Sequence, residues 1–554
     1  MPQDIYDKII TMAKRRGFIY PSFEIYGGIA GFYDYGPLGA QLKLNIENLW
    51  RTFFVLQDNC VEVSTPTITL YEVLKASGHV EEFTDLTVDC PNCKKSFKVE
   101  DIIGTIPVDE ALKEKKIKCL SCGTILDNPH PVNLMFATTI GAGDGRPAFL
   151  RPETAQGIFT NFHLLYRYNR ERLPFGVVQV GRGYRNEISP RQGTLRQREF
   201  SMAEAEVFID PQNKTHLRFA SIANEPLILN DNETEHHVTV GEAVTRHLIN
   251  SQALAYYMHL TSAFLLAAGV NPKKFRFRKH ACDELAHYAT ECWDAELYSE
   301  RFGWIECVGI ADRSAYDLNA HLQASGVDMY AVRKYEEPKV VKRHRITPKM
   351  DVLGPLFKQE AGKIKALLEA MDATKAGHVT VTIDKKTVKI PENAYEVIEV
   401  EEKTMGEKFV PNVIEPSFGI DRILYFLIEH NYKEVSKKDE EYTILSFPPG
   451  IAPITAGVFP LTDDDRLVSV AQKINDDLRT ACIHTNFDTA GTIGRRYARM
   501  DEVGTPFCIT IDHESLTDHK VTIRNRDTTE QQRVPIATVI DLIKSQIFCG
   551  HGKK

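Results

Sequence analysis

The chain has 554 residues, of which 43% are hydrophobic and 26% are charged. A single domain usually holds roughly 100 to 200 residues, so this length indicates several domains and excludes a small binding module. The 67 Lys and Arg against 75 Asp and Glu give a net charge of -8. That balance excludes bulk electrostatic capture of nucleic acid and leaves RNA contacts to local patches.

The N-terminal segment MPQDIYDKIITMAKRRGF lacks the apolar core of a signal peptide and is not an Arg-rich, acid-poor transit sequence. Its spacing predicts an amphipathic helix. No run in the chain approaches the roughly 20 apolar residues that span a bilayer. We therefore expect a soluble cytoplasmic protein with no membrane partner.

From Ile5 to about Asp89, the helical periodicity of LGAQLKLNIENLWRTFF follows the Gly-rich segment EIYGGIAGFYDYGPLG, whose glycines and proline indicate turns. We interpret this stretch as the start of a catalytic core. From Cys90 to about Pro131 the composition shifts to Cys and Lys, which indicates an insertion over residues 90–131.

Four of the eleven cysteines form two CxxC pairs, Cys90 with Cys93 and Cys119 with Cys122, separated by 25 residues. An odd number of cysteines in a large chain without a secretion signal favours thiols or metal ligands over a disulfide framework. Two such knuckles are typical of a tetrahedral structural Zn²⁺ site. The alternative is four unligated surface thiols. So short an insertion is expected to lack a core of its own, so zinc would fold it.

Strand-like runs return in FLRPETAQGIF, FGVVQVGRGYRNE and REFSMAEAEVFID. Residues 325–402 then form a second, charged insertion of unassigned role, which includes the alternating, hairpin-like VTVTIDKKTVKIP. The charged segment NYKEVSKKDEE is interpreted as a linker. Beyond it, apolar runs alternate with helical ones and predict a separate α/β domain over residues 441–554.

The strongest chemical signal is GYRNEISPRQGTLRQREFSMAEAE. We expect a hairpin whose first strand carries Arg185 and Glu187 and whose second passes through Arg196, Arg198, Glu199, Phe200 and Glu204. Alternation turns one face of each strand toward a common cleft, where guanidiniums bind an anion and carboxylates receive amino groups. The alternative for a bare R-x-E is a solvated hairpin with surface ion pairs.

This full string resembles motif 2 of class II aminoacyl-tRNA synthetases, and its RNEISPR, REF and AEAE wording is similar to the glycyl-tRNA synthetase family. Further segments agree in order along residues 5 to 530: EIYGGIAGFYDYGPLG, ASGHVEEFTDL, FLRPETAQGIF, WIECVGIADRSAYDL, VIEPSFGIDR as motif 3, and TAGTIGRRYARMDEVGTPF. The weakest match is VEVSTPTIT with Pro66, for motif 1, which builds the dimer interface in the family.

The resemblance implies an α/β (α+β) architecture. A class II catalytic domain built on an antiparallel sheet would occupy residues 1–440 and carry both insertions, and an anticodon-binding domain would occupy 441–554. It also implies a homodimer that binds tRNA(Gly). If zinc folds the Cys-rich insertion, we expect that module to approach the acceptor end of the RNA.

The implied activity is ATP-dependent attachment of glycine to the 3′ end of tRNA(Gly) through a glycyl-adenylate, with release of AMP and pyrophosphate. Arg185 would hold the α-phosphate, where negative charge develops as the glycine carboxylate attacks. Arg422 would grip the γ-phosphate, and Arg196 would assist on the pyrophosphate side. These three arginines are the candidate catalytic residues.

The resemblance also implies the rest of the ATP site. Glu187 would accept the adenine amino group, Phe200 would stack beneath the ring, and Glu306 would bind Mg²⁺, which prefers a carboxylate with phosphate oxygens and water. The implied ATP-binding set is Arg185, Asn186, Glu187, Leu195, Arg196, Phe200, Glu306, Cys307, Gly419 and Arg422.

Glycine offers only an ammonium and a carboxylate, so an excess of carboxylates around a small cavity is expected. By resemblance, Glu204 and Glu415 with Ser417 would surround the ammonium. Arg313 would balance the acids, and Glu153 would complete the wall. Each is a buried charge that requires partners.

Two alternatives stay open at this level: a noncatalytic synthetase-like protein, and a synthetase of the same class that charges serine, threonine or proline. In the C-terminal domain, TIGRRYARMDE and TIRNRDTTEQQR offer Arg, Asn and Gln to unstacked bases, or else form a solvated charged face.

Overall fold

The computed structural model describes residues 4–548 except 105, 191, 282, 287, 372–378, 384–385 and 438–439. The chain divides into two compact units, Met1–Met329 with Pro411–Lys554, and Tyr330–Val410. The second unit is therefore the charged insertion, with ends a few residues later than the sequence indicated.

The predicted N-terminal amphipathic helix is confirmed as α1 (Ile5–Arg16). The Asp4 side chain caps it by accepting a hydrogen bond from the Tyr6 N–H, and Gly17 ends it in the left-handed conformation at φ 77°. Lys14, Arg15 and Arg16 occupy the last turn, where cations complement the helix dipole.

A nine-stranded sheet forms the centre of the larger unit. Its neighbours pair antiparallel, except for the parallel pairs β12 with β14 and β10 with β3. In spatial order the strands are β13 (Thr234–Thr239), β12 (Pro226–Asp231), β14 (Phe275–Lys279), β15 (Glu291–Ser299), β16 (Gly303–Ser314), β21 (Asn412–Gly419), β11 (Glu199–Ile209), β10 (Phe175–Tyr184) and β3 (Val61–Glu62).

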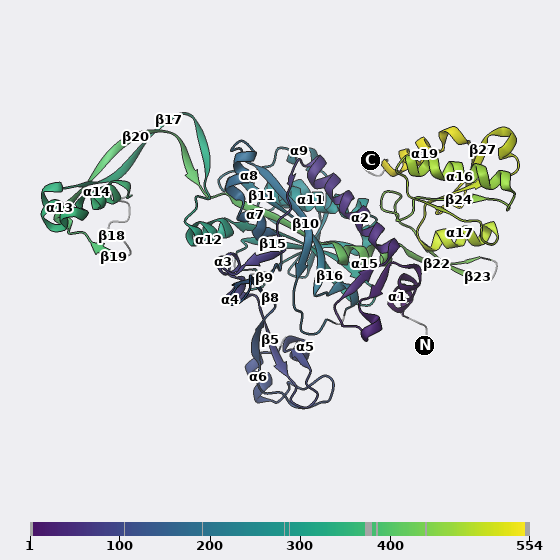
Figure 1. Cartoon of the computed structure of the whole chain (residues 1–554), viewed down its shortest axis with the longest axis horizontal. Coiled ribbons are helices and arrows are strands. Elements are labelled where there is room, and N and C mark those ends of the chain that lie inside the picture. The colour runs from purple at the N-terminus through teal and green to yellow at the C-terminus, as the bar shows by residue number, and fades with distance from the viewer. Residues whose placement is uncertain are drawn as a thin grey trace. The chain divides into compact units, whose positions relative to one another are not determined.

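Three helices cover one face of this sheet: α2 (Pro37–Arg51), α11 (Gln252–Ala267) and α15 (Ile420–Asn431) (Figure 1). Ala203, Ala205 and Val207 of β11 belong to the hydrophobic core on that face. Because successive side chains of a strand alternate, the residues between them point to the opposite face, which is left for the site. The N-terminus of α2 packs so closely that a Cβ on Gly39 would lie 1.8 Å from the Phe18 carbonyl oxygen.

Shorter elements surround the sheet. They are β1 (Ile19–Pro21), β2 (Tyr33–Tyr35), β4 (Ile68–Leu70), α3 (Tyr71–Ala76), α4 (His79–Glu82), β8 (Ala137–Ile140), β9 (Arg146–Leu150), α7 (Ala155–Phe159), α8 (Phe162–Tyr168), α9 (Phe219–Ile222), α10 (Val240–Thr245) and α12 (Tyr316–Ser325). A π-helical stretch, Thr52–Gln57, follows α2.

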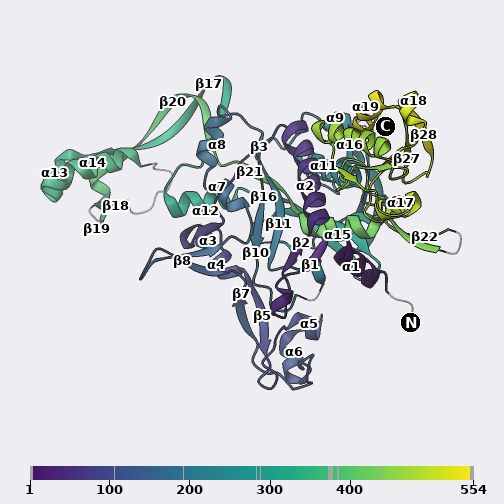
Figure 2. The same cartoon turned by 45° about the vertical axis from the view of Figure 1, so that its right-hand side comes forward.

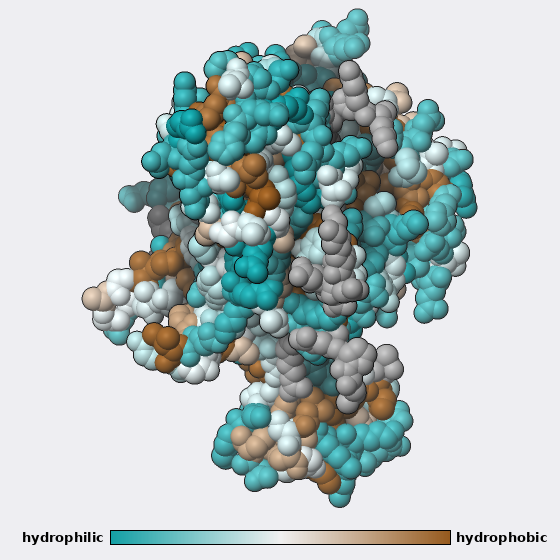
Figure 3. Space-filling view, turned by 90° about the vertical axis from the view of Figure 1, so that its right-hand side faces the viewer, coloured by the Kyte–Doolittle hydropathy of each residue, from teal (hydrophilic) through white to brown (hydrophobic). Residues whose placement is uncertain are grey.

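The Cys-rich insertion is a small module with its own three-stranded sheet, β6 (Ser96–Lys98), β5 (Thr84–Asp89) and β7 (His130–Asn133), and two short helices, α5 (Glu100–Ile103) and α6 (Val108–Lys113) (Figure 2). Its strands enter and leave side by side, Thr84 opposite Asn133, so the module is longer at both ends than residues 90–131. The expectation that it lacks a core is wrong: Val88, Phe97 and Val99 belong to a buried cluster within it. The module forms the separate lobe at the foot of the space-filling view (Figure 3).

The second unit consists of a long two-stranded ribbon, β17 (Ala331–Pro348) paired with β20 (Tyr395–Phe409), and a small globular end. That end contains α13 (Met350–Phe357), α14 (Ala361–Ala370) and the hairpin β18 (Thr380–Ile383) with β19 (Lys386–Lys389), around its own apolar cluster. The predicted hairpin in VTVTIDKKTVKIP is confirmed.

The segment interpreted as a linker is instead the hairpin β22 (Tyr432–Lys437) with β23 (Glu440–Leu445). It precedes a five-stranded mixed sheet in the order β25 (Thr485–Phe487), β24 (Ala456–Pro460), β26 (Phe507–Ile511), β27 (Lys520–Asn525) and β28 (Gln531–Pro535). Its helices are α16 (Asp465–Thr480), α17 (Ile493–Glu502), α18 (Ser515–Asp518) and α19 (Val539–Phe548). None of the described helices combines the length and the apolar composition that spanning a bilayer requires.

Candidate active site

The charged hairpin is present, but its strands are shorter than the sequence indicated. Strand β10 ends at Tyr184 and β11 begins at Glu199, so Arg185, Glu187 and Arg196 lie in the connecting loop rather than on the strands. The Arg185 N–H still donates to the Arg198 carbonyl at 2.9 Å, but the next N–H, of Asn186, donates to Leu134 at 2.7 Å. The chain thus leaves the ladder to bind the base of the Cys-rich module.

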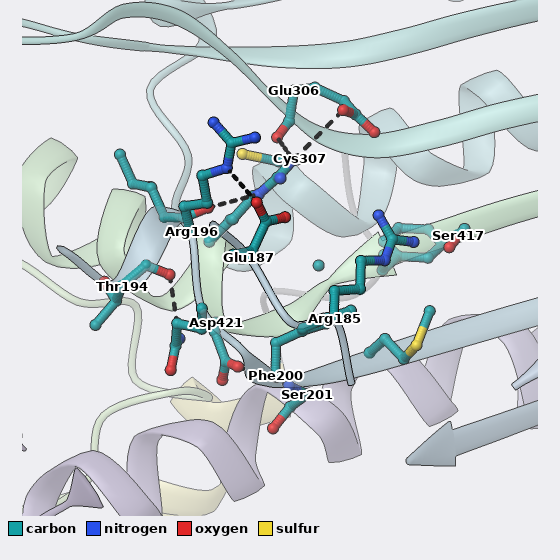
Figure 4. Close-up of a pocket in the computed structure, with 16 residues that line it drawn as sticks. Arg185, Glu187, Thr194, Arg196, Phe200, Ser201, Glu306, Cys307, Ser417 and Asp421 are labelled. Carbon is teal, nitrogen blue, oxygen red and sulfur yellow. Dashed lines mark hydrogen bonds and ion pairs between the residues drawn. The ribbon is translucent and has the colours of Figure 1, made fainter. Parts of the chain in front are cut away.

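A cleft opens over this loop, with about 670 Å³ of space between its lining atoms, open solvent included. Arg185, Glu187, Arg196, Phe200 and Glu306 surround it in Figure 4. Of the residues that the sequence assigned to ATP, the cleft brings together all but one; Asn186 is exposed and lies outside the lining. The members present are Arg185, Glu187, Leu195, Arg196, Phe200, Glu306, Cys307, Gly419 and Arg422.

Arg185 is held between two aromatic rings. Its guanidinium carbon lies 5.3 Å from the ring centroid of Phe83 and 5.3 Å from that of Phe200. Its Nε is buried without a hydrogen-bond partner. A buried donor on a charged group is costly to leave unpaired, so this side chain is suited to an anionic ligand in the cleft.

The other two arginines are already oriented by protein oxygens. Arg196 Nε donates to Glu187 Oε2 at 2.8 Å. Arg422, in the first turn of α15, donates from Nε to the Leu195 carbonyl at 3.0 Å and from Nη1 to the Glu306 carbonyl at 2.7 Å. Arg422 Nη1 also lies 3.4 Å from Glu306 Oε2. The half-exposed Glu306 carboxylate therefore faces the cleft, which suits a cation shared with phosphate oxygens.

Cys307 and Gly419 line the cleft but present no charged group to it. The Cys307 thiol is buried and lies 3.6 Å from the Ile305 carbonyl, to which it donates. Gly419 N-caps α15 and pairs with Met202 of β11.

Beyond Ser417, the sheet carries a buried cluster of acids on neighbouring strands. Glu204 lies on β11, Glu415 and Ser417 on β21, and Arg313 near the end of β16. The Ser417 hydroxyl donates to Glu204 Oε1 at 2.8 Å, and the Thr154 N–H donates to Glu204 Oε2 at 2.6 Å.

Arg313 is the cation of this cluster and is 1% exposed. It donates to Glu415 Oε2 at 2.8 Å and through two bonds, of 2.8 and 3.0 Å, to Asp317. Its guanidinium stacks on Tyr288, with the carbon 3.8 Å from the ring centroid. Arg313 Nη2 lies 3.9 Å from Glu153, the fourth predicted member of the pocket. The structure thus brings together all five residues that the sequence assigned to glycine.

The acids of this cluster outnumber its cations, and their pKa values are shifted as a result. Burial raises the pKa of Glu415 to about 8, although Arg313 acts to lower it. Burial and the neighbouring Glu153 raise the pKa of Glu204. For Glu153, burial would raise the pKa, but His79 and Arg313 outweigh it and hold the pKa below its usual range. The pocket therefore holds more acidic groups than it can keep ionised, and an incoming ammonium would favour their ionised form.

Sequence reasoning missed several members of the pocket. Glu206 is fully buried, neither of its carboxylate oxygens has a hydrogen-bond partner, and burial together with Glu415 raises its pKa well above the usual value. It stands two residues after Glu204 in AEAE, so the strand period places it on the same face. Asp317 follows Arg313 by four residues at the start of α12, and the i to i+4 spacing was a usable signal. No sequence pattern indicated that His79 belongs to the pocket; its Nε2 lies 3.4 Å from Glu153 Oε2.

The four cysteines of the module converge. The Sγ atoms of Cys90 and Cys122 are 3.5 Å apart, as are those of Cys93 and Cys119, and all four lie within 4.8 Å of one another. Four thiolates at about 2.3 Å from a tetrahedral Zn²⁺ would be separated by about 3.8 Å, so the donor set fits that ion. The nine described cysteines, these four included, are all free of disulfides.

In the C-terminal domain, three of the six arginines offered to RNA are structural. Arg524 makes a buried two-bond pair with Asp501 at 2.8 and 2.9 Å. Arg526 donates to the carbonyls of Gly504 and Phe447, and Arg496 to that of Pro460. Of the two charged runs, exposed side chains include Arg495, Gln531 and Gln532.

Comparison with known proteins agrees with this architecture. The family described as tRNA synthetase class II core domain (G, H, P, S and T) matches residues 142–431, and the family described as anticodon binding domain matches residues 453–546. A prolyl-tRNA synthetase structure from Giardia lamblia, in complex with prolyl-adenylate, aligns with TM-score 0.54 and 12% identity over 99% of this chain and 79% of that one. One from Cryptosporidium parvum aligns with TM-score 0.52 and 11% identity, over 99% and 76%. The fold and the matched families are those of a class II aminoacyl-tRNA synthetase.

Sequence relatives narrow the class further. A glycine–tRNA ligase from Methanothrix thermoacetophila is 48% identical over 98% of this chain and 97% of its own length. Those from Methanocaldococcus jannaschii and Archaeoglobus fulgidus are 44% and 46% identical, over 99% and 97% of this chain and 100% and 96% of their own lengths. The chain belongs to the glycine–tRNA ligase family.

Proposed function

We propose that this protein attaches glycine to tRNA(Gly) at the expense of ATP, through a glycyl-adenylate. The observation that carries the proposal is the excess of buried acids over Arg313 in a pocket that adjoins the arginine-lined cleft. An ammonium group neutralises the acids, and the arginines of the cleft bind a triphosphate. A synthetase for serine, threonine or proline would share the cleft. Its pocket would have to leave room for a side chain, which this acid-lined pocket for a small ammonium compound does not need.

The two sites are continuous because Ser417 belongs to both: it lines the cleft and donates to Glu204. Glycine held by its ammonium at Glu204 and Glu415 would direct its carboxylate toward Arg185. A carboxylate is already ionised at neutral pH, so its attack on the α-phosphorus requires no general base. Pyrophosphate leaves, and the mixed anhydride is then attacked at its carbonyl carbon by the terminal ribose hydroxyl of the tRNA, which releases AMP.

Each arginine has a distinct role in this proposal. Arg185, whose Nε lacks a protein partner, stabilises the charge that develops at the α-phosphate. Arg422 and Arg196, already oriented by protein oxygens, bind the γ-phosphate and the pyrophosphate side. Glu306 is the proposed protein ligand of Mg²⁺, which would neutralise phosphate charge when bound. Glu187 would accept a hydrogen bond from the adenine amino group, and Phe200 would stack on the adenine ring.

We propose Zn²⁺ at Cys90, Cys93, Cys119 and Cys122. Two pairs of sulfur atoms at 3.5 Å support it. Each knuckle closes with the same backbone bonds, from the first cysteine's N–H to the carbonyl five residues on: Cys90 to Lys95 at 2.9 Å and Cys119 to Thr124 at 2.8 Å. Metal analysis of the purified protein should find one zinc per chain.

We also propose that the protein acts as a homodimer. Strand β3, which follows the π-helical stretch in the segment matched to motif 1, forms one open edge of the nine-stranded sheet. Leu56, in the π-helical stretch five residues before β3, is 75% exposed. An open strand edge and an exposed apolar side chain in the same segment are each suited to burial against a second copy. Sedimentation equilibrium should give a mass of about twice 62.7 kDa.

The test of the proposed activity is amino-acid-dependent ATP–pyrophosphate exchange, which needs no tRNA. Glycine should support exchange, and alanine, serine, threonine and proline should not. Exchange with another amino acid in place of glycine would refute the pocket assignment. No exchange with any of them, from folded protein with its metal, would favour the noncatalytic alternative.

A further inference from the structure

The base of the Cys-rich module contacts the loop that forms one side of the nucleotide cleft. Three contacts join it to the loop that carries Arg185 and Glu187. The ring of Phe83, directly before β5, lies against the Arg185 guanidinium. The Asn186 N–H donates to the carbonyl of Leu134, directly after β7, at 2.7 Å, and the Ser189 hydroxyl donates to the carbonyl of Ser96 at 3.0 Å.

Lys98 adds a charged contact at the same place. It is the last residue of β6 and is 8% exposed, which is rare for a lysine. Its ammonium forms an ion pair with Asp85 on the neighbouring strand and lies 3.9 Å from Glu187 Oε2. Because the same Glu187 oxygen accepts from Arg196, Lys98 helps to fix the carboxylate that faces the nucleotide.

The hairpin that presents these contacts is closed by the first cysteine knuckle. Cys90 follows β5 directly, and β6 begins three residues after Cys93. The register is Asp89 opposite Ser96 and Thr87 opposite Lys98. The second knuckle, in a loop segment beyond α6, carries the other two sulfur atoms. A metal at the four cysteines would therefore fix both the register of β5 with β6 and the path of the chain between β6 and β7.

We propose that the metal-bound module acts on amino-acid activation as well as on RNA: it holds the nucleotide loop, and Lys98 is a positioning residue for ATP. This inference rests on the proposed ATP and zinc sites. Loss of the metal would loosen the strand pair β5 and β6, and with it the position of Lys98 and of the Ser96 carbonyl. ATP would then bind more weakly even in the absence of tRNA.

The first test compares metal-loaded and chelator-treated full-length protein, with refilling by Zn²⁺ as the reversal. ATP binding is measured by calorimetry without glycine or tRNA, and hydrogen exchange is followed at residues 185–189. We expect metal removal to weaken ATP binding on the order of tenfold, which is about 1.4 kcal/mol, and to speed exchange in that loop. Unchanged ATP binding with loss of tRNA charging would mean that the module serves RNA alone, and would overturn the proposal. No ATP binding by the metal-loaded protein would instead overturn the proposed function on which it rests.

The second test keeps the metal and changes the contact. Lys98→Met should keep the zinc content of the wild type and raise the KM for ATP in pyrophosphate exchange about tenfold, with the KM for glycine unchanged; Lys98→Arg should restore much of the loss. The matched control is Lys95→Met, because Lys95 belongs to the same hairpin, is exposed and contacts Ser121 rather than the nucleotide loop. An equal effect of both variants, or a KM for ATP within twofold of wild type in Lys98→Met, would overturn the role of Lys98.

Discussion

Replacing Arg185 with Ala should impair catalysis at little cost to folding. Its Nε has no hydrogen-bond partner, and the contacts that hold the guanidinium are the rings of Phe83 and Phe200. Each ring contributes about 0.5–1 kcal/mol, so Arg185→Ala should cost about 1–2 kcal/mol of unfolding free energy. Removing one donor to a developing anionic charge typically costs about 2.7–4 kcal/mol of transition-state stabilisation. The rate of glycine-dependent exchange should therefore fall about 100- to 1,000-fold.

The assay is initial-rate ATP–pyrophosphate exchange at saturating glycine, beside urea unfolding of the same preparations. Arg182→Ala is the matched control, because Arg182 lies on the same hairpin, is 55% exposed in its side chain and pairs with Glu199 outside the cleft. Its loss should cost no more than about 1 kcal/mol of stability and leave exchange almost unchanged. Exchange by Arg185→Ala within tenfold of wild type would refute the assignment, as would a loss of exchange matched by the control.

Three further changes examine other parts of the site. Arg313→Met leaves Glu415 and Asp317 as unpaired buried acids, so the unfolding free energy measured in denaturant should fall by about 3–5 kcal/mol; a loss below 1 kcal/mol would contradict the charge arrangement. Because the pKa of Glu415 is raised to about 8, its carboxyl is protonated in the empty pocket at pH 6–7 and must ionise to receive an ammonium. The dissociation constant of glycine should therefore fall by up to about tenfold per pH unit between pH 6 and 8, and a flat titration would exclude this linkage. Gly183→Ala would place a Cβ 2.8 Å from the Phe200 ring, so we expect the KM for ATP to rise severalfold with the KM for glycine unchanged; an unaltered KM for ATP would argue against adenine stacking on Phe200.

Residue types in a fixed order along one segment predicted part of the site, and the family resemblance predicted residues from distant segments, such as Arg313, Glu415 and Arg422. Arg185 to Glu204 form one hairpin, and the two CxxC pairs each form one turn, so spacing alone brings their members together. It could not show that Glu187 is held by both Arg196 and Lys98, because Lys98 comes from a module that is 89 residues earlier in the chain. Contacts between distant segments leave no periodic pattern.

Three structural expectations differed from the fold for identifiable reasons. In NYKEVSKKDEE charged side chains masked the alternation of a solvated hairpin, β22 with β23, so the segment was interpreted as a linker. The core of the Cys-rich module was missed because its apolar residues, such as Val88, Phe97 and Ile117, are scattered among lysines. The hairpin strands were predicted too long because the loop's N–H groups bind outside the ladder, as Asn186 does at Leu134.

The two-stranded ribbon of β17 and β20 begins and ends the second unit at a single pair, Ala331 opposite Phe409. Partners across such a pair are about 5 Å apart, so a tight turn could join them. Residues 332–408 in this sense form a cassette. Their apolar cluster is made only of residues from this segment, and the segment contributes no strand to the catalytic sheet. Lengthening, exchanging or removing this cassette would therefore leave every strand of the catalytic sheet in place.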